Sequence, residues 1–406
     1  MAMGNYRRVL SRPGVRTLLL LMFASRIPVT ATNMVLTLHV VLTLHRDYGA
    51  AGLVGAAGTI GVALGAPLTG RLVDAFGLRK MVMITTVAYG AYWLVAWTLT
   101  YPVLLVASFV GGVFALPVIS IGRQALAALV PTEDRKTAFS LDSISVEMSF
   151  MVGPAVGVLI ATKVSTTAAV ISVGVLLCFA GLALFVVNPP VRGVHDEEPP
   201  DGVRPPRRQW LRAPMLATLA TGCGAVFVLA GTEVTMVAAL RAVGEVGWTG
   251  IVTISMCLAS AAGGVVYGAV HRTPGPLLLL SLLGLLAVPV GLVGGQWWVL
   301  CLALVPTNLM CAPTLASTAD RISRLAPAAV RGEAMGLQSS ALTLGGALGS
   351  PVVGTVVDHW GPPGGFAAAG IGGVLIAVLL VPLARRRDRP EPGAVDQAVP
   401  VSVTAN

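Results

Sequence analysis

Twelve apolar runs, each about as long as a membrane-spanning helix, divide this sequence from end to end. A helix that crosses the hydrocarbon core of a bilayer needs about 20 mostly apolar residues. The runs occupy 15–42, 50–72, 81–100, 102–128, 138–162, 168–188, 213–240, 247–270, 275–294, 296–320, 333–357 and 365–384. Short joints separate most of them, as expected where successive helices cross a membrane in opposite directions. The sequence therefore predicts an all-α membrane protein with twelve transmembrane helices.

The composition excludes several classes of soluble protein. Charged residues make up only 11% of the chain, whereas a soluble domain has about 25%. The five cysteines stand singly inside apolar runs, and the five histidines are scattered, so no metal-ligand spacing is present. No nucleophilic triad or nucleotide-binding glycine loop is found either. We therefore predict that the chain is not an enzyme and holds no metal or cofactor.

The distribution of positive charge predicts the orientation in the membrane. With the N-terminus placed inside, 22 of the 27 Lys and Arg residues fall in inner segments, three in outer segments and two within spans. Cytoplasmic loops carry such an excess of Lys and Arg. We expect a multi-pass protein of the cell membrane with both termini in the cytoplasm. The net charge of +9 then reflects orientation and does not indicate a nucleic-acid partner.

One joint differs from the others and divides the chain into two halves. Residues 189–212 are rich in proline and charge, which is typical of a linker. We therefore predict a six-helix bundle over 1–188, a cytoplasmic linker over 189–212 and a second six-helix bundle over 213–384. The polar segment 385–406 is expected to be a disordered cytoplasmic tail.

An internal repeat supports this division. When the chain is shifted by 196 residues, Pro117 falls on Pro313 and Arg135 falls on Arg331. Matches of proline and arginine are informative in a composition dominated by Ala, Gly and Leu. The two halves thus read as pseudo-symmetric copies of one unit, an architecture described for secondary transporters.

A charged, glycine-containing loop follows the second span. It has the pattern G-x-x-x-D-x-x-G-x-(R/K)-(R/K), formed by Gly70, Arg71, Asp74, Gly77, Arg79 and Lys80. The loop resembles the signature loop of the major facilitator superfamily, and the resemblance covers the twelve spans and the central linker. It implies that Asp74 meets the helix near Arg331–Leu337 and latches the halves together at the cytoplasmic side. The alternative is that the loop only turns the chain.

A second motif lies in the fifth span. Gly153, Pro154 and Gly157 resemble the G-P-x-x-G core of the family's antiporter motif, which is associated with exporters. Small residues let helices approach closely, and a proline bends a helix. The alternative interpretation is simple close packing.

Charged residues inside the spans are candidates for proton coupling, because they are costly in a bilayer. Counting from the inner side, Arg26 lies about 16 Å deep and Glu147 about 14 Å deep. We therefore expect the two to pair near the midplane, with Glu147 carrying the coupling proton. The alternatives are a static ion pair or two charges that face a cavity separately. Glu233 and Asp142 are the further candidates.

Polar and aromatic residues within the spans are candidates for the substrate cavity. They are Asn33, Thr37, Tyr89, Tyr92, Trp93 and Asn308. Asn33 and Thr37 are four residues apart and therefore share a helix face.

Together these features predict a secondary active transporter that works by alternating access. We expect a monomeric, proton-coupled antiporter for the efflux of a small amphipathic drug or metabolite, as in multidrug export. The proton gradient is the energy source, and the expected partners are the substrate, protons and lipid. The alternatives are a carrier or importer of sugars or other metabolites, and a transport-inactive membrane scaffold or receptor.

Overall fold

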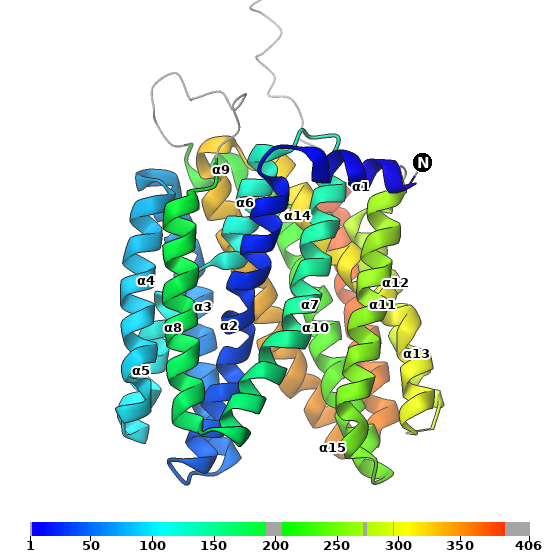
Figure 1. Cartoon of the computed structure of the whole chain (residues 1–406). Coiled ribbons are helices and arrows are strands. Elements are labelled where there is room, and N and C mark those ends of the chain that lie inside the picture. Colours follow the sequence, from blue (N-terminus) through cyan, green and yellow to red (C-terminus); the bar gives the residue numbers. More distant parts are fainter. Residues whose placement is uncertain (1, 192–204, 271–273, 295, 386–406) are drawn as a thin grey trace, which may run out of the picture.

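The computed structural model describes residues 2–191, 205–270, 274–294 and 296–385. Regular secondary structure in these ranges is entirely helical (Figure 1). The predicted linker lies mostly outside the described residues, as does the predicted tail beyond Arg385.

The first half contains helices α1 to α8. Their bounds are α1 Ala2–Ser11, α2 Val15–Leu42, α3 Tyr48–Phe76, α4 Leu78–Val95 with a short 3₁₀ turn Ala96–Thr98, α5 Tyr101–Val113, α6 Val118–Leu129, α7 Arg135–Lys163 and α8 Thr166–Val187.

The second half follows the short helix α9, Arg207–Trp210. Its helices are α10 Ala213–Ala242, α11 Thr249–Ala269 after a 3₁₀ turn Val246–Trp248, α12 Pro276–Ala287 continued by the 3₁₀ turn Val288–Leu292, α13 Trp297–Leu309, α14 Cys311–Leu325, the 3₁₀ turn Ala328–Val330 and α15 Arg331–Arg385.

The twelve predicted spans are all found as helices. Ten helical segments of the described chain are long and apolar enough to cross a membrane, and Pro276–Leu292 forms a shorter apolar one. The last of the ten runs for 57 residues and contains two spans, because the backbone turns at Gly361, which has a φ of 67°. The predicted all-α, twelve-span architecture is confirmed.

Two spans predicted as continuous helices are interrupted. The run 102–128 breaks between α5 and α6, and the run 296–320 breaks at Met310, between α13 and α14. A proline is found at each break: Pro117 immediately precedes α6, and Pro313 lies in the first turn of α14. Proline is tolerated there because its missing N–H would have no helical partner. The two prolines are the pair that the internal repeat aligns, so the break recurs in both halves.

Glycines let two pairs of helices pack in the same way. A Cβ atom at Gly153 of α7 would overlap Thr30 of α2, and a Cβ atom at Gly345 of α15 would overlap the Cys223 carbonyl of α10. Gly157 likewise lies against Val35. The glycines of the antiporter-like motif therefore provide close contact between α2 and α7, and α10 and α15 repeat it.

The two halves meet at one end of the molecule. Helix α1 lies across this end, and α9 lies at the same end (Figure 1); we call it the α1 end. The largest cluster of buried apolar side chains lies here and combines both halves, with Leu126 and Phe139 from the first and Ile322 and Met335 from the second. The other three clusters each belong to one half. Towards the opposite end the halves diverge (Figure 1).

Candidate functional site

A carboxylate near the end of α3 caps the first turn of α15. Asp74 accepts hydrogen bonds from the backbone N–H groups of Gly332 (3.0 Å) and Glu333 (2.8 Å). These groups form the positive end of the helix dipole and have no partner within their own helix. A Cβ atom at Gly70 would overlap the Gly332 carbonyl, so the two backbones touch directly. The contact lies in the region that the loop resemblance implied.

The remaining loop residues have different surroundings. The Arg71 guanidinium forms an ion pair with Glu333, at 3.0 Å. Gly77 has a φ of 82° and forms the turn between α3 and α4. Arg79 donates a hydrogen bond to a main-chain carbonyl of α8, within the first half, and Lys80 is exposed. Contact with α15 is therefore made by only part of the loop.

The segment that precedes the second half joins the same contact. Arg207 of α9 donates to Glu333 Oε1 from Nε at 2.6 Å and from Nη2 at 2.5 Å. Glu333 is buried, and Trp210 of α9 is buried in the cluster shared by the two halves. Glu333 thus binds arginines from α3 and from α9. Sequence reasoning did not identify it, although it is an isolated acid at the start of an apolar run.

Helix α1 also binds both halves. Tyr6 Oη lies 2.6 Å from the carbonyl of Val265 and 3.2 Å from that of Gly264, both in α11. Burial raises the pKa of Tyr6 from 10 to about 12, so the hydroxyl remains a donor at neutral pH. On the other side, Arg8 of α1 pairs with Asp134, the residue before α7, at 3.7 Å, and Arg12, which follows α1, donates to the same carboxylate at 2.7 Å and 3.2 Å. This helix was not among the predicted functional elements.

Further hydrogen bonds between the halves end on main-chain carbonyls. Ser120 of α6 donates to Met335 of α15 at 3.1 Å, and Thr137 of α7 donates to Gly268 of α11 at 2.9 Å. Ser340 of α15 donates to a carbonyl of α3 at 2.5 Å. The α1 end is therefore closed by a continuous set of contacts.

Glu147 lies where these contacts stop. Its carboxylate accepts hydrogen bonds from Ser260 Oγ of α11 (2.9 Å) and Cys311 Sγ of α14 (3.3 Å). The residue is about 18 Å along α7 from the α1 end, at 1.5 Å per residue. The hydrogen bonds and ion pairs that we describe between the halves lie between the α1 end and about this level. Glu147 is thus a half-buried acid on the boundary between the halves.

The expected pairing of Arg26 with Glu147 is wrong. Arg26 instead pairs with Asp142, at 2.5 Å, and Arg123 approaches the second oxygen of that carboxylate at 3.4 Å. The physical reason is the direction in which each side chain leaves the axis of its helix. Asp142 and Glu147 are five residues apart, which turns the helix face by about 140°. Asp142 therefore faces the interior of the first half, whereas Glu147 faces the second half.

Three other candidates have solvent access. Glu233 and Asn33 are exposed, and Thr37 is half-buried. Glu233 lies within electrostatic range of Cys257 of α11, as Glu147 does.

The other cavity candidates lie in packing positions. Tyr89, Tyr92 and Trp93 form one aromatic cluster that packs with α5 and α8 inside the first half. Trp93 is 1% exposed, and Tyr92 bonds Ser108 of α5. Asn308 is buried and donates to the carbonyl of Leu304 in its own helix. These four side chains therefore do not line the boundary between the halves, because their polar groups are satisfied within one half or buried there.

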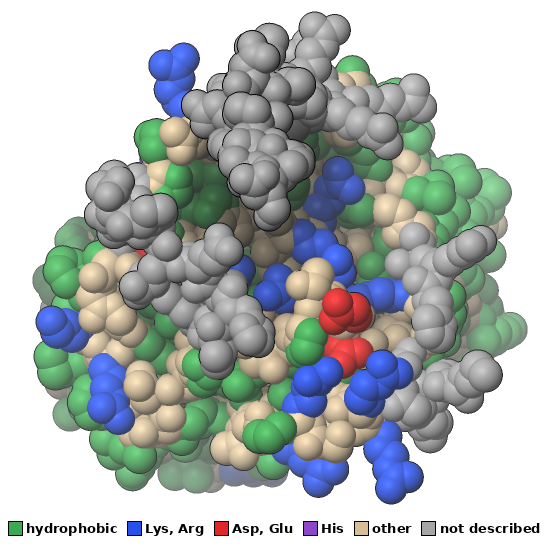
Figure 2. All heavy atoms as spheres, turned by 90° about the horizontal axis from the view of Figure 1, so that it is seen from above, with side chains coloured by type: hydrophobic (Ala, Val, Ile, Leu, Met, Phe, Trp, Pro, Cys, Tyr) green, Lys and Arg blue, Asp and Glu red, His purple; other side chains and the backbone are tan. Residues whose placement is uncertain are grey.

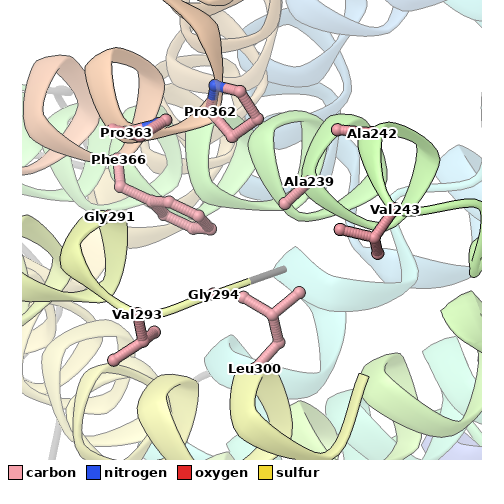
Figure 3. A pocket seen from close by; sticks show the side chains of 10 residues that line it. All are labelled: Ala239, Ala242, Val243, Gly291, Val293, Gly294, Leu300, Pro362, Pro363 and Phe366. Carbon is pink, nitrogen blue, oxygen red and sulfur yellow. The ribbon is translucent and has the colours of Figure 1, made fainter. Parts of the chain in front are cut away.

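A separate apolar pocket lies within the second half, near the turn at Gly361 (Figure 3). Its lining includes Ala239, Leu300, Pro362, Pro363 and Phe366 and contains no charged side chain. All of the lining residues belong to the second half, so this pocket is separate from the boundary between the halves. In the described residues, no group of three or more His, Cys, Asp or Glu side chains is placed to hold a metal ion.

Comparison with known structures identifies the same architecture. The human organic anion transporter MFSD10 (TETRAN) has 17% sequence identity and a TM-score of 0.70, over 91% of this chain and 100% of that chain. The proton:xylose symporter XylE bound to 6-bromo-6-deoxy-D-glucose has 14% sequence identity and a TM-score of 0.72, and the match covers 91% of this chain and 96% of that chain. A bacterial homologue of the iron transporter ferroportin in the outward-facing state has 15% sequence identity and a TM-score of 0.71, and the match covers 92% of this chain and 99% of that chain. At such low identity these similarities establish the fold alone.

The sequence itself identifies the family. No curated protein matches this chain, but the family model of the Major Facilitator Superfamily matches residues 18–294 and 234–404. The loop resemblance, the helical architecture and the family model agree, and the protein is a multi-pass membrane transporter rather than an enzyme. The chain belongs to the major facilitator superfamily.

Proposed function

We propose that this transporter exports a small amphipathic drug or metabolite from the cell in exchange for protons. It works as a monomer in the cell membrane, by alternating access between the two halves. The location of Glu147 is the observation that carries the proposal. A single ionisable side chain bonds α7 to α11 and α14 where the contacts between the halves end, so its protonation state acts on the contact that must break.

The charge distribution supports a cytoplasmic α1 end. Lys and Arg side chains are spread over this face (Figure 2), including exposed Arg7, Arg8, Arg16 and Lys80. Such an excess of positive charge is typical of the cytoplasmic side. In this orientation the structure is closed to the cytoplasm, and the halves part on the outer side.

The chemistry at Glu147 supports proton coupling. An ionised carboxylate accepts strong hydrogen bonds, and both Ser260 and Cys311 donate to it. Protonation from the outer side removes the charge and weakens both bonds. The closed α1 end is then less stable, and the halves rearrange to face the cytoplasm. There the proton leaves, substrate binds, and the ionised carboxylate again favours the outward-facing state.

The antiporter-like motif supports export over import. Its glycines bring α7 against α2, and Pro154 lies between them in the same helix. A proline removes one helical hydrogen bond and allows bending. Helix α7 thus combines the acid with a bend that lets the helix rock.

The test is proton movement in everted membrane vesicles. A pH-sensitive dye reports the gradient while candidate compounds are added to native protein and to Glu147→Gln. We expect compound-dependent proton release from native vesicles and loss of that release in the variant, since glutamine keeps the shape but carries no proton. Glu133→Gln is the matched control, because Glu133 lies at the surface of the α1 end, and it should respond as the native protein does.

The other outcomes are equally informative. Release that persists in Glu147→Gln would place the proton elsewhere, with Glu233 and then Asp142 as the next residues to test. Absence of release with every compound would contradict proton-coupled efflux and favour a uniporter or an importer.

A further inference from the structure

A second group of charges is buried inside the first half, separate from Glu147. Arg26 of α2, Arg123 of α6 and Asp142 of α7 form one ion-paired cluster, with separations of 2.5 Å and 3.4 Å to the two carboxylate oxygens. The side chains of Arg26, Arg123 and Asp142 are 1%, 4% and 0% exposed. Buried ionic groups of this kind are rare in membrane proteins and mark functional sites.

The charges in this cluster do not balance. Two guanidinium cations face one carboxylate, and the described residues supply no second acid within ion-pair distance. Ser145 is the only other side chain that bonds Arg26 among the described residues, at 3.4 Å, and it is neutral. A net positive charge is therefore held away from water, which is costly unless an anion compensates it.

One donor of the cluster has no acceptor. The Nε–H group of Arg26 is fully buried and has no hydrogen-bond partner in the part of the chain that the structure describes. A buried donor without an acceptor is destabilising. A compact group with negatively charged oxygens would both compensate the excess positive charge and accept a hydrogen bond from the free donor.

The cluster adjoins the boundary that opens during transport. Arg123 lies three residues after Ser120 and thus on nearly the same face of α6. Ser120 bonds Met335 and Ser339 of α15, in the other half. Separation of α6 from α15 when the α1 end opens would uncover Arg123 first. The site is then accessible from the side on which an exporter collects its substrate.

We propose that Arg26 and Arg123 bind the anionic group, a carboxylate or sulfonate, of the transported molecule. This inference rests on the proposed function and adds the class of substrate, an amphipathic organic anion. Arg123 contacts the anion directly, because it lies on α6, the helix that reaches the boundary through Ser120. Asp142 holds Arg26 in place while the site is empty, and the bound anion supplies the missing negative charge and an acceptor for the free donor.

The test uses the full chain in the proton-release assay with matched probes. Each aromatic scaffold is supplied as a carboxylate, as its methyl ester and as an amine. We expect release with carboxylates and not with their esters or amines. Arg123→Gln should weaken the response to carboxylates about tenfold or more, whereas Arg123→Lys, which keeps the charge but loses the planar fork, should weaken it less than Arg123→Gln does.

The choice of Arg123→Gln separates binding from folding. This substitution leaves a balanced Arg26–Asp142 pair, so a merely structural cluster predicts a stable protein with unchanged selectivity. Arg241→Gln is the control, because Arg241 is exposed at the opposite end. If esters or amines are exported as well as carboxylates, or if Arg123→Gln keeps the native preference for carboxylates, the anion site is wrong while proton-coupled efflux stands.

Failure of the proposed function is recognised separately. If no probe releases protons from native vesicles, equilibrium binding to the full chain in lipid nanodiscs decides the inference, with dansylglycine and its methyl ester as fluorescent probes. Preference for dansylglycine that Arg123→Gln abolishes would support the anion site without coupling. Equal binding of the two probes, or binding of neither, would overturn it.

Discussion

At the scale of single residues, Asp74 illustrates how one carboxylate can join two halves of a transporter. Both of its oxygens accept, one from Gly332 and one from Glu333. The Asp74→Asn amide would place an NH₂ group against one of these N–H donors. We expect a loss of about 1 kcal/mol from the closed α1 end, or about a fivefold change in its population. The distance between a spin label at Lys80 in the first half and one at Leu278 in the second half, measured by electron–electron resonance, would lengthen.

Asp47→Asn is the matched control for this prediction. Asp47 caps α3 at the opposite end through a single hydrogen bond from Ala50, at 2.7 Å. Asparagine caps a helix about as well as aspartate does where one oxygen accepts. The label distance should therefore stay native in Asp47→Asn. An unchanged distance in Asp74→Asn as well would show that the cap does not hold the α1 end closed.

The residue scale also shows what a sequence can and cannot predict. Depth along a helix is a matter of counting, so Glu147 and Arg26 were correctly placed within the spans. The direction in which a side chain points around the helix axis depends on how neighbouring helices pack. The periodicity of one sequence does not reveal that direction when a helix is apolar on every side. The partner of Arg26 was for this reason expected on the wrong face of α7. The aromatic residues of α4 were misjudged in the same way.

At the scale of elements, α1 is a surface helix that connects the two halves. Tyr6→Phe removes the hydroxyl that bonds α11 and leaves the ring in place. Because burial raises the pKa of Tyr6 above its ordinary value, ionisation is disfavoured in the docked helix. Docking is therefore fully stable below pH 10 and weakens as the pH rises from 10 through about 12. Tyr6→Phe should lack this transition.

Ultraviolet absorbance of tyrosinate measures this prediction. A titration of native protein minus that of Tyr6→Phe isolates the single group, and its midpoint should lie near 12. Tyr101→Phe serves as the control, because Tyr101 lies at the opposite end of the first half, where α5 begins. A Tyr6 midpoint near 10 would mean that the ring is exposed and α1 is not docked.

Elements also differ in how well they could be predicted. The long apolar helices follow from composition and length, and their ends fall within a few residues of the expected runs. The short elements α1 and α9 are polar, and their importance comes from contacts with segments that are distant in the sequence. No local pattern predicts that Arg207 pairs with Glu333, 126 residues later. The breaks before α6 and within the tenth span could have been inferred from the two repeated prolines.

At the scale of the whole molecule, the structure represents one state of a cycle. In the proposed orientation it faces outward, so a membrane-impermeant thiol reagent added outside should modify Asn33→Cys, which is exposed. Ser120→Cys should resist the reagent, because Ser120 is 2% exposed and lies at the contact with α15. Labelling of native protein measures the background from the five cysteines of the chain.

A second arm of the experiment tests the alternation itself. Reagent applied to the cytoplasmic side should modify Ser120→Cys about five times faster when Asp74→Asn is also present. Modification of Ser120→Cys from outside in the otherwise native chain would contradict the proposed orientation. The two-fold repeat was visible in the sequence, but the conformational state was not, since the same chain must adopt both.

The closure of the α1 end has a consequence for the comparison of related sequences. Tyr6, Ser120, Thr137 and Ser340 all donate to main-chain carbonyls of the other half. Every residue type presents such a carbonyl, so Ala63, Val265 and Met335 could change their side chains without losing the bond, whereas Gly268 could not, because a Cβ atom there would overlap Tyr6. Evolution would then preserve the donor while the acceptor drifts. Methods that infer proximity from correlated substitutions should therefore miss these hydrogen bonds and detect the interface only through side-chain pairs such as Arg71 with Glu333.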